Sequence, residues 1–327
     1  MRHLLLATLA LAACGDNLPG ISLAELEASR HAAECERYVR CGLVTDEQTC
    51  TTFFRRELDP ALVAMVDAGK LRYDPIAAAA CNKQLAALSC DATTAEARAV
   101  PAVCKTVLIG TINAGATCLD DRECATGRCD APRCAPDACC PGGCSSYAAP
   151  AKLDELCDLE VGCVDGAFCG ADKLCHALGA IGGACDADLH CAPGLACIGA
   201  TDLQAGACRP LPKIGESCPY QRCAEIGARC AGQSCVKVGI TGDACTTDTD
   251  CSEFHLCDPA SRRCTDTPTL GETCTGRCAG EAWCEAAGMC RAPQPNAAPC
   301  TADDQCATQY CAEGPVFDAC AQPAICF

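Results

Sequence analysis

The chain has 327 residues, of which 39 are cysteine and only 4% are aromatic, and its formal net charge at pH 7 is −17. So few large side chains exclude a thick hydrophobic core, and a cysteine content of about 12% is typical of a disulfide scaffold. Because disulfides persist in oxidising compartments, the composition argues against a cytosolic protein. The negative charge argues against binding to nucleic acid, whose phosphates it would repel.

The start of the chain predicts a signal peptide over residues 1–13. Met1-Arg2-His3 is a basic start, and residues 4–11 form an apolar run that is too short to span a bilayer. Leu11-Ala12-Ala13-Cys14 follows directly and resembles the lipobox of bacterial lipoproteins. Without Cys14 the chain keeps 38 cysteines, an even number that is compatible with complete pairing.

The lipobox resemblance implies cleavage before Cys14, a diacylglyceryl thioether on its sulfur, and acylation of the new amine by a fatty acid such as palmitate. Residues 14–21 would then be the lipidated cysteine and a tether. Two or more acyl chains hold a protein stably on a membrane, so this anchor would be permanent. Gly15 follows the cysteine where an aspartate would favour the inner membrane, so the expected location is the outer membrane or cell surface. The alternative is a plainly secreted protein in which Cys14 is removed or free.

Residues 22–110 predict a small all-α domain. The capping box Ser22-Leu23-Ala24-Glu25 starts a helix that runs to about Arg40. Further helix starts are predicted at Thr45-Asp46-Glu47-Gln48 (a capping box opening a helix toward Leu58), Asp59-Pro60, Asp74-Pro75, and Thr93 with Glu96. Six cysteines predict about three disulfides in this domain: Cys35, Cys41, Cys50, Cys81, Cys90 and Cys104.

Residues 111–327 predict seven cysteine-rich repeats, and "GGACDADLHCAPGLAC" at 182–197 illustrates their pattern. The repeats open at Cys118, Cys157, Cys185, Cys218, Cys245, Cys274 and Cys300, with four cysteines in each. A glycine precedes the opening cysteine by three residues in five repeats, at Gly115, Gly182, Gly215, Gly242 and Gly271. An acidic residue follows it by three in five repeats, at Asp121, Glu160, Asp188, Asp248 and Asp303.

This pattern resembles the Dickkopf N-terminal cysteine-rich domain and similar modules of bacterial lipoproteins. The resemblance implies a small disulfide-rich fold with short hairpins and little regular secondary structure. It also favours pairing of the first cysteine with the third and the second with the fourth. Two repeats represent the expected disulfide set: Cys185, Cys191, Cys197 and Cys208, and then Cys245, Cys251, Cys257 and Cys264.

The pattern has departures. The Cys157 repeat lacks the glycine, and the Cys218 and Cys274 repeats lack the acidic residue. Four cysteines fall outside the count of four per repeat: Cys139, Cys140, Cys144 and Cys326.

The sequence predicts no catalytic, cofactor-binding or metal-binding residues. It contains no Cys-x-x-Cys pair for zinc, no Gly-x-Ser-x-Gly, and no His-Glu-x-x-His. After removal of His3, His31 lies on a predicted helix. His176, His190 and His255 lie near cysteines in three different repeats and are expected to be solvent-exposed rather than catalytic bases. The recurring aspartate is expected to bond backbone N–H groups in its own turn rather than calcium, with Asp120/Asp121 and Asp303/Asp304 as the strongest calcium candidates.

These patterns predict a non-enzymatic lipoprotein of the cell envelope. Its partners would be the membrane, through the lipid on Cys14, and an unknown protein, and its role would be protein–protein interaction, adhesion or envelope structure. The alternative function is a protease inhibitor or modulator of secreted enzymes. For that function, "CIGATDLQAGAC" at 197–208 is the candidate loop, because it is the longest stretch between cysteines inside a predicted repeat.

Overall fold

The fold is taken from a computed structural model, which describes residues 19–54, 58–130, 141–146, 150–157, 162–201, 204–307, 311–312 and 318–320. It is disulfide-rich, with a few helices, small hairpin sheets and little other regular structure. Several residues singled out from the sequence lie outside this part of the chain: the signal peptide, Cys14, Cys139, Cys140, Glu160 and Cys326.

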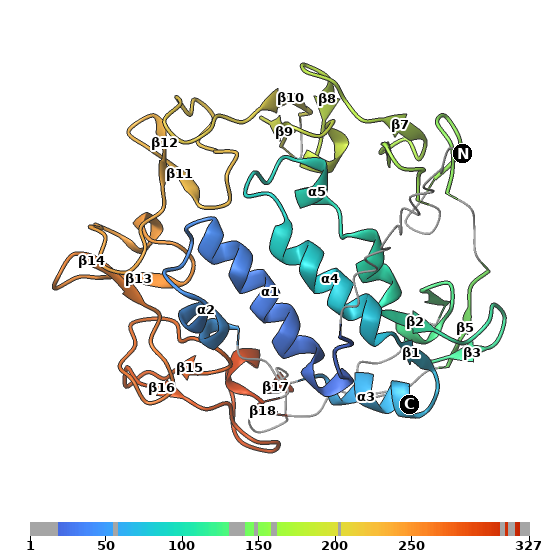
Figure 1. Cartoon of the computed structure of the whole chain (residues 1–327), viewed down its shortest axis with the longest axis horizontal. Helices are drawn as coiled ribbons and strands as arrows, with labels where there is room; N and C mark the ends of the chain where they lie inside the picture. The colour runs from blue at the N-terminus through green and yellow to red at the C-terminus, as the bar shows by residue number, and fades with distance from the viewer. Residues whose placement is uncertain are drawn as a thin grey trace, which may run out of the picture.

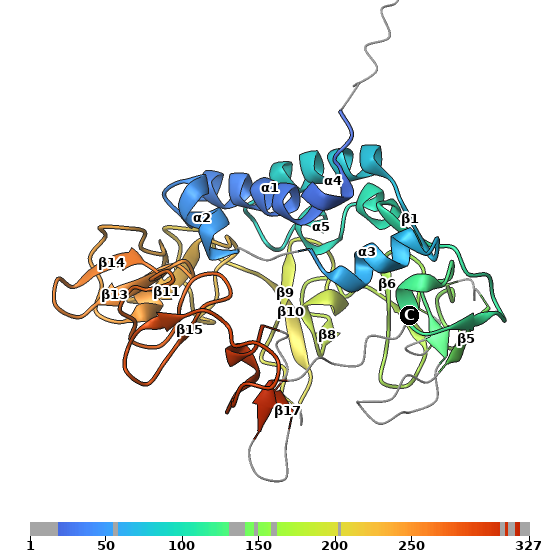
Figure 2. The same ribbon diagram turned by 90° about the horizontal axis from the view of Figure 1, so that it is seen from below.

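Residues 22–110 form what we call the helical layer, shown in blue to green in Figures 1 and 2. Its helices are η1 (Leu23–Glu25), α1 (Leu26–Arg40), α2 (Glu47–Phe53), α3 (Pro60–Asp67), α4 (Pro75–Ala87), α5 (Ala95–Arg98) and η2 (Ala102–Thr106). Helices α1 and α4 lie side by side and enclose a small core with η2. The buried members of this core are Leu26, Ala77, Ala78, Cys81 and Val107.

The predicted helix starts are largely confirmed. Asp59 and Asp74 each accept a hydrogen bond from a backbone N–H of the first turn, directly before Pro60 and Pro75. Two predicted caps were wrong by one residue, because Asp46 rather than Thr45 caps α2, and Thr94 rather than Thr93 caps α5. Helix α2 ends at Phe53, short of the predicted Leu58.

The prediction of a purely α-helical domain was wrong in one respect. Strand β1 (Leu71–Tyr73) pairs antiparallel with β2 (Leu108–Gly110), so the helical layer also contains a two-stranded sheet. The three expected disulfides are present: Cys35–Cys50, Cys41–Cys90 and Cys81–Cys104. The sheet and the Cys81–Cys104 bond together fix the chain that leaves the helical layer at Gly110.

After Gly110 the chain forms seven units of four cysteines, each named here by its first cysteine. Their elements are β3 (Thr117–Cys118), η3 (Asp121–Glu123), β4 (Cys129–Asp130), β5 (Gly142–Cys144), β6 (Ala167–Cys169), β7 (Cys175–Ala177), β8 (Ala184–Cys185), η4 (Asp188–His190), β9 (Leu195–Ile198), β10 (Gly206–Pro210), β11 (Ala228–Ala231), β12 (Ser234–Lys237), η5 (Asp248–Asp250), β13 (His255–Asp258), β14 (Arg263–Asp266), β15 (Trp283–Cys284), β16 (Cys290–Arg291), η6 (Asp303–Gln305), β17 (Cys311–Ala312) and β18 (Ala319–Cys320). Each unit has one antiparallel hairpin, to which β3 and β8 add a third strand in the Cys118 and Cys185 units.

Two crossed disulfides close every unit, joining the first cysteine to the third and the second to the fourth. The Cys185 and Cys245 units show the pattern, with the bonds Cys185–Cys197, Cys191–Cys208, Cys245–Cys257 and Cys251–Cys264. This is the connectivity that the resemblance implied. One assignment needs correction: Cys144 was placed outside the count of four, but it is bonded to Cys124 and is the fourth cysteine of the Cys118 unit.

A left-handed backbone residue starts each unit, three positions before its first cysteine. These residues have φ between +63° and +90°: Gly115, Asp154, Gly182, Gly215, Gly242, Gly271 and Ala297. In each case the N–H donates to the carbonyl of the fourth cysteine, at 2.7 to 2.9 Å. Glycine adopts this conformation without steric cost, which explains its recurrence at this position.

The units curl around the helical layer rather than extending away from it (Figures 1 and 2). Among the described residues, four of them make hydrogen bonds to the layer: the Cys118, Cys185, Cys218 and Cys274 units. The pairs are Lys70 with Glu123, Arg98 with the Asp188 and Cys191 carbonyls, Thr93 with Gly194, Cys90 with Ile226, and Phe53 with Gly280. The layer is therefore the support on which the cysteine-rich units are arranged.

Arginines also join neighbouring units. Arg222 of the Cys218 unit forms an ion pair with Asp188 of the preceding unit, with Nη2 2.6 Å from Oδ2. Arg277 of the Cys274 unit donates to the carbonyl of His255, again in the preceding unit, at 2.8 Å. Both arginines directly precede the second cysteine of units that lack the recurring acidic residue. These two departures from the sequence pattern thus coincide with contacts between units.

Candidate functional site

The recurring aspartate binds backbone, but not in the way the sequence predicted. Its Oδ1 accepts the N–H of the third cysteine, eight or nine residues further on, rather than an N–H of its own turn. The four described pairs are Asp121 with Cys129, Asp188 with Cys197, Asp248 with Cys257, and Asp303 with Cys311, at 2.6 to 2.9 Å. The aspartate therefore ties the loop between the first two cysteines to the hairpin.

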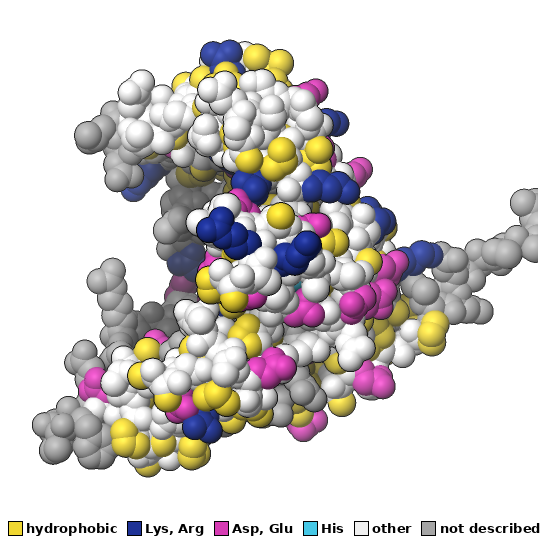
Figure 3. All heavy atoms as spheres, turned by 90° about the vertical axis from the view of Figure 1, so that its left-hand side faces the viewer, with side chains coloured by type: hydrophobic (Ala, Val, Ile, Leu, Met, Phe, Trp, Pro, Cys, Tyr) yellow, Lys and Arg dark blue, Asp and Glu magenta, His cyan; other side chains and the backbone are white. Residues whose placement is uncertain are grey.

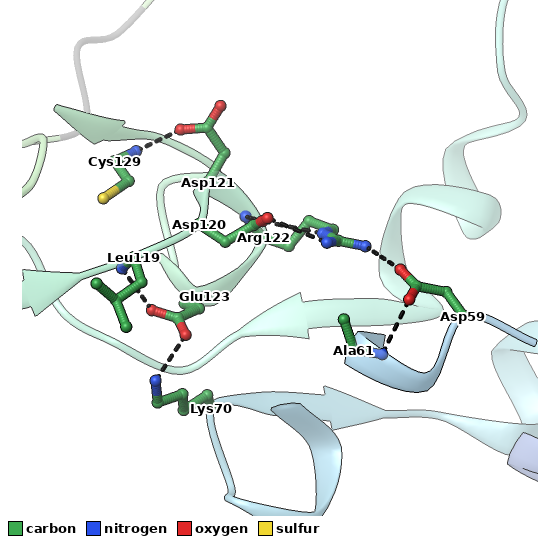
Figure 4. Close-up of polar contacts among 9 residues, drawn as sticks. All are labelled: Asp59, Ala61, Lys70, Leu119, Asp120, Asp121, Arg122, Glu123 and Cys129. Carbon is green, nitrogen blue, oxygen red and sulfur yellow. Dashed lines mark hydrogen bonds and ion pairs between the residues drawn. The ribbon is translucent and has the colours of Figure 1, made fainter. Parts of the chain in front are cut away.

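The first calcium candidate, Asp120 with Asp121, does not converge on one point. The Asp120 carboxylate accepts from the Arg122 guanidinium at 2.9 and 3.0 Å, while Asp121 points to Cys129 on the other side of the turn (Figure 4). The hydrogen bonds from Arg122 lower the pKa of Asp120. Both carboxylates are thus occupied by donors of the protein. In the second candidate pair, Asp303 is bonded to Cys311.

A buried ion pair holds the first unit to the helical layer in the same region. Glu123 is fully buried, and it accepts from Lys70 Nζ at 2.7 Å and from the Leu119 N–H at 2.8 Å (Figure 4). Arg122 extends the contact to Asp59 of the helical layer, at 3.2 Å. Because a buried carboxylate without partners is costly, these bonds make Glu123 a fixed part of the junction. These ion pairs and hydrogen bonds therefore join the Cys118 unit to the helical layer and have a structural role.

One constellation of serine, histidine and aspartate was not predicted from the sequence. Ser252 Oγ lies 2.6 Å from His255 Nδ1, and His255 Nε2 lies 3.5 Å from Asp266 Oδ1. Ser252 and His255 are both buried, and Ser252 Oγ also accepts the Phe254 N–H at 3.4 Å. A nucleophile must reach its substrate, so the burial and occupied hydrogen bonds assign this serine a structural role.

The histidines differ in exposure. The prediction that the three histidines of the units are exposed was wrong for His255, which is buried, and His190 is only partly exposed. Burial lowers the pKa of His255, outweighing the opposite effect of the Asp266 carboxylate. His176 is exposed and bonds Asp172 at 2.9 Å. The ring of His190 stacks on Phe168 of the preceding unit with 3.9 Å between ring centres. Both His255 and His190 therefore take part in packing.

A groove lies between the helical layer and the Cys157 and Cys185 units. Its volume is about 920 Å³. One wall comes from the end of α4, from α5 and from η2, and includes Ala87, Val100 and Pro101. The opposite wall includes Leu178, Leu189 and Pro193. We call this hollow the apolar groove.

Two large apolar side chains in the walls of the apolar groove are exposed to solvent. Val100 keeps 61% of its surface exposed and Leu189 keeps 65%. Arg98 joins the two walls, because its Nη1 donates to the carbonyls of Asp188 and Cys191 at 3.1 Å each. Most of the wall surface is apolar, and this guanidinium is already engaged, so the groove suits a partner with apolar side chains.

The face formed by the Cys218, Cys245 and Cys274 units has a different character. There the acidic and basic side chains are interspersed, and the hydrophobic ones are scattered between them (Figure 3). Single exposed apolar side chains are normal on a protein surface, whereas a grouped set marks a contact site. The apolar groove is therefore the better candidate for binding.

The loop at 197–208 does not stand out as an inhibitory loop. Half of its described residues belong to strands β9 and β10, and Thr201 forms a bridge with Gln204 between them. Nothing in the described residues favours this loop over others as a protease-binding element.

No protein-family model, curated protein or solved structure matches this chain. Among the described residues, no helix has both the length and the apolar character needed to cross a membrane. The assignment of a function therefore depends on the residues of this chain and their geometry.

Proposed function

We propose that this protein is a non-enzymatic lipoprotein of the cell envelope that binds a partner protein. In this proposal Cys14 carries the lipid, and tandem cysteine-rich repeats of the Dickkopf type are arranged on the helical layer. The apolar groove is the observation that supports a binding role. Its partner would be a short protein segment with apolar side chains, inserted between Val100 and Leu189.

The walls of the apolar groove are stiff, which favours binding. The Cys185–Cys197 and Cys191–Cys208 bonds close the unit that carries Leu189, and Cys81–Cys104 fixes η2 to α4 behind Val100. A preformed site loses little conformational entropy when it binds, so more of the contact energy remains as affinity. Burial of apolar surface contributes about 25 cal/mol per Å².

Site-specific photo-crosslinking tests the groove. A photoreactive amino acid at position 100 or 189, in a lipid-free Cys14→Ser protein, should trap the same partner from an envelope extract. The same residue at position 270 is the matched control, because Leu270 is exposed to a similar extent (62%) and is absent from the groove walls. Trapping of the partner equally at position 270, or of unrelated proteins at 100 and 189, would contradict a groove-specific interaction.

The lipid anchor has a separate test. The wild-type protein should fractionate with membranes and carry the mass of acyl groups on its N-terminal peptide. The Cys14→Ser variant should move to the soluble fraction, because no thioether can form without the sulfur. An intact wild-type protein without any acyl mass would refute the anchor while leaving the groove proposal open.

A further inference from the structure

The described chain begins on the outer side of the helical layer, opposite the cysteine-rich units (Figure 2). Two hydrogen bonds fix it there. The Ile21 N–H donates to the Pro75 carbonyl at 3.1 Å, and the Tyr73 hydroxyl donates to the Ile21 carbonyl at 2.8 Å. Gly20 lies directly against Pro75 and Ile76. The last residues of the tether, Gly20 and Ile21, are therefore attached to the protein at the N-terminal end of α4.

The distance from this point to a lipid on Cys14 is limited by the length of the chain. Ile21 is seven positions after Cys14. A fully extended chain covers at most about 3.3–3.6 Å per residue, so the tether reaches roughly 25 Å in any conformation. The first turn of α4 must stay within that distance of the lipid.

The distribution of charge favours one orientation on the membrane. Residues 14–110 carry 13 acidic and 10 basic side chains, a net charge of −3. Residues 111–327 carry 29 acidic and 14 basic side chains, a net charge of −15. An anionic lipid surface repels the cysteine-rich units more strongly than the helical layer, within about one Debye length.

We propose that the outer face of the helical layer, around Pro75 and Ile76, rests on the phospholipid surface, so that the cysteine-rich units face away from the membrane. The inference depends on the proposed lipidation of Cys14. Ile76 is exposed to 53% and lies where the tether begins, so it would contact the lipid headgroups. The Cys118 to Cys300 units would then be held on the side open to other proteins.

Tryptophan quenching by brominated phospholipids tests this orientation. The chain has one tryptophan, so Trp283→Phe gives a background without intrinsic tryptophan fluorescence. In the lipidated protein, Ile76→Trp is the membrane-side probe, and Leu156→Trp and Leu270→Trp are matched probes on exposed positions of the units. The vesicles contain phosphatidylethanolamine, phosphatidylglycerol and brominated phosphatidylcholine. Quenching by acrylamide in lipid-free Cys14→Ser versions checks that all three probes are accessible to solvent.

The expected result is a loss of fluorescence for Ile76→Trp on brominated vesicles and no loss for the other two probes. Equal quenching at all three positions, or stronger quenching at Leu156→Trp or Leu270→Trp, would overturn the orientation. Co-flotation with the vesicles separates this failure from a failure of the proposed function. A Trp283→Phe protein that does not float lacks the anchor, whereas one that floats without quenching at position 76 has the anchor and another orientation.

Discussion

The ring of Phe254 meets the ring of Phe53 edge-on, with 4.9 Å between the ring centres. Phe53 ends helix α2, whereas Phe254 belongs to the Cys245 unit, some two hundred residues later. Tyr38 and Phe54 complete the cluster, and Phe254 is almost completely buried in it. The helical layer and a cysteine-rich unit thus share one aromatic core, so neither part is complete without the other.

Phe254→Ala should destabilise the whole fold. Loss of a buried phenylalanine costs about 3–5 kcal/mol through lost burial and the cavity left behind. Thermal unfolding followed by near-ultraviolet circular dichroism should show a lower midpoint for the transition that includes the helices. Phe168→Ala is the control, since Phe168 is only partly buried and lies outside this cluster. A helix transition that shifts equally in both variants would argue against a shared core.

Ala297→Gly should stabilise the protein. Ala297 has φ +67° at a position where five other units have glycine, and a non-glycine residue there costs about 1–2 kcal/mol. Gly242→Ala should destabilise by a similar amount, because a Cβ at Gly242 would meet no atom within 4 Å and only backbone strain would change. Ala292→Gly, at an exposed alanine whose φ is not positive, is the control and should give no gain. Denaturant titration measures all three.

Stability should fall as the pH drops through about 6.5. Burial lowers the pKa of His255 below its unfolded value of about 6.5, so the unfolded chain binds the proton more readily. The contribution of neutral His255 is complete above that pH and is lost toward the folded-state pKa. Asp266 and Asp243 oppose this effect, and Arg277 reinforces it.

The slope of the melting temperature between pH 7.5 and 5 measures the effect of His255. His255→Gln should flatten this slope, whatever its effect on the absolute midpoint. An unchanged slope in His255→Gln would show that other groups produce the acid sensitivity.

Reduction of the disulfides should affect the two parts of the chain differently. The buried clusters of the Cys118, Cys157, Cys245 and Cys300 units consist almost entirely of cysteine, so the reduced units have no apolar core. The α1–α4 core still contains Leu26, Ala78 and Val107. After complete reduction, far-ultraviolet circular dichroism should retain part of the helical signal, while proteolysis should cut the units first. A reduced protein whose units resist protease would contradict this account.

The local features of the fold could be predicted from the sequence, because their causes lie within a few residues. The aspartates before Pro60 and Pro75 act as caps through contacts two or three positions away. The hairpins of the units were implied by the resemblance of their cysteine pattern to known modules, and that pattern is also local. In contrast, the pairing of Leu71 with Gly110 joins two three-residue strands far apart in the chain, and neither strand has an alternating pattern of its own.

The candidate site could not be predicted, because it arises where distant segments meet. Val100 and Leu189 come to line one groove only when the Cys185 unit docks on α5. The role of Cys144 as a unit cysteine could not be predicted, because it lies fifteen positions after Cys129 and Cys134, Cys139 and Cys140 come between them. The bond from Asp188 to the Cys197 N–H depends on the hairpin that it stabilises, so the spacing alone pointed to a turn.

The order of the elements along the chain has a consequence for its oxidation during the export that we propose. Every disulfide of the seven units closes a loop of only 10 to 20 residues. As a chain emerges with its N-terminus first, the helical layer is available before any unit that docks on it. The two disulfides of each unit can then form while the unit docks on the folded helical layer, before the four cysteines of the next unit emerge. This order limits mispairing among the cysteines. Slow translocation should therefore increase the yield of correctly oxidised protein.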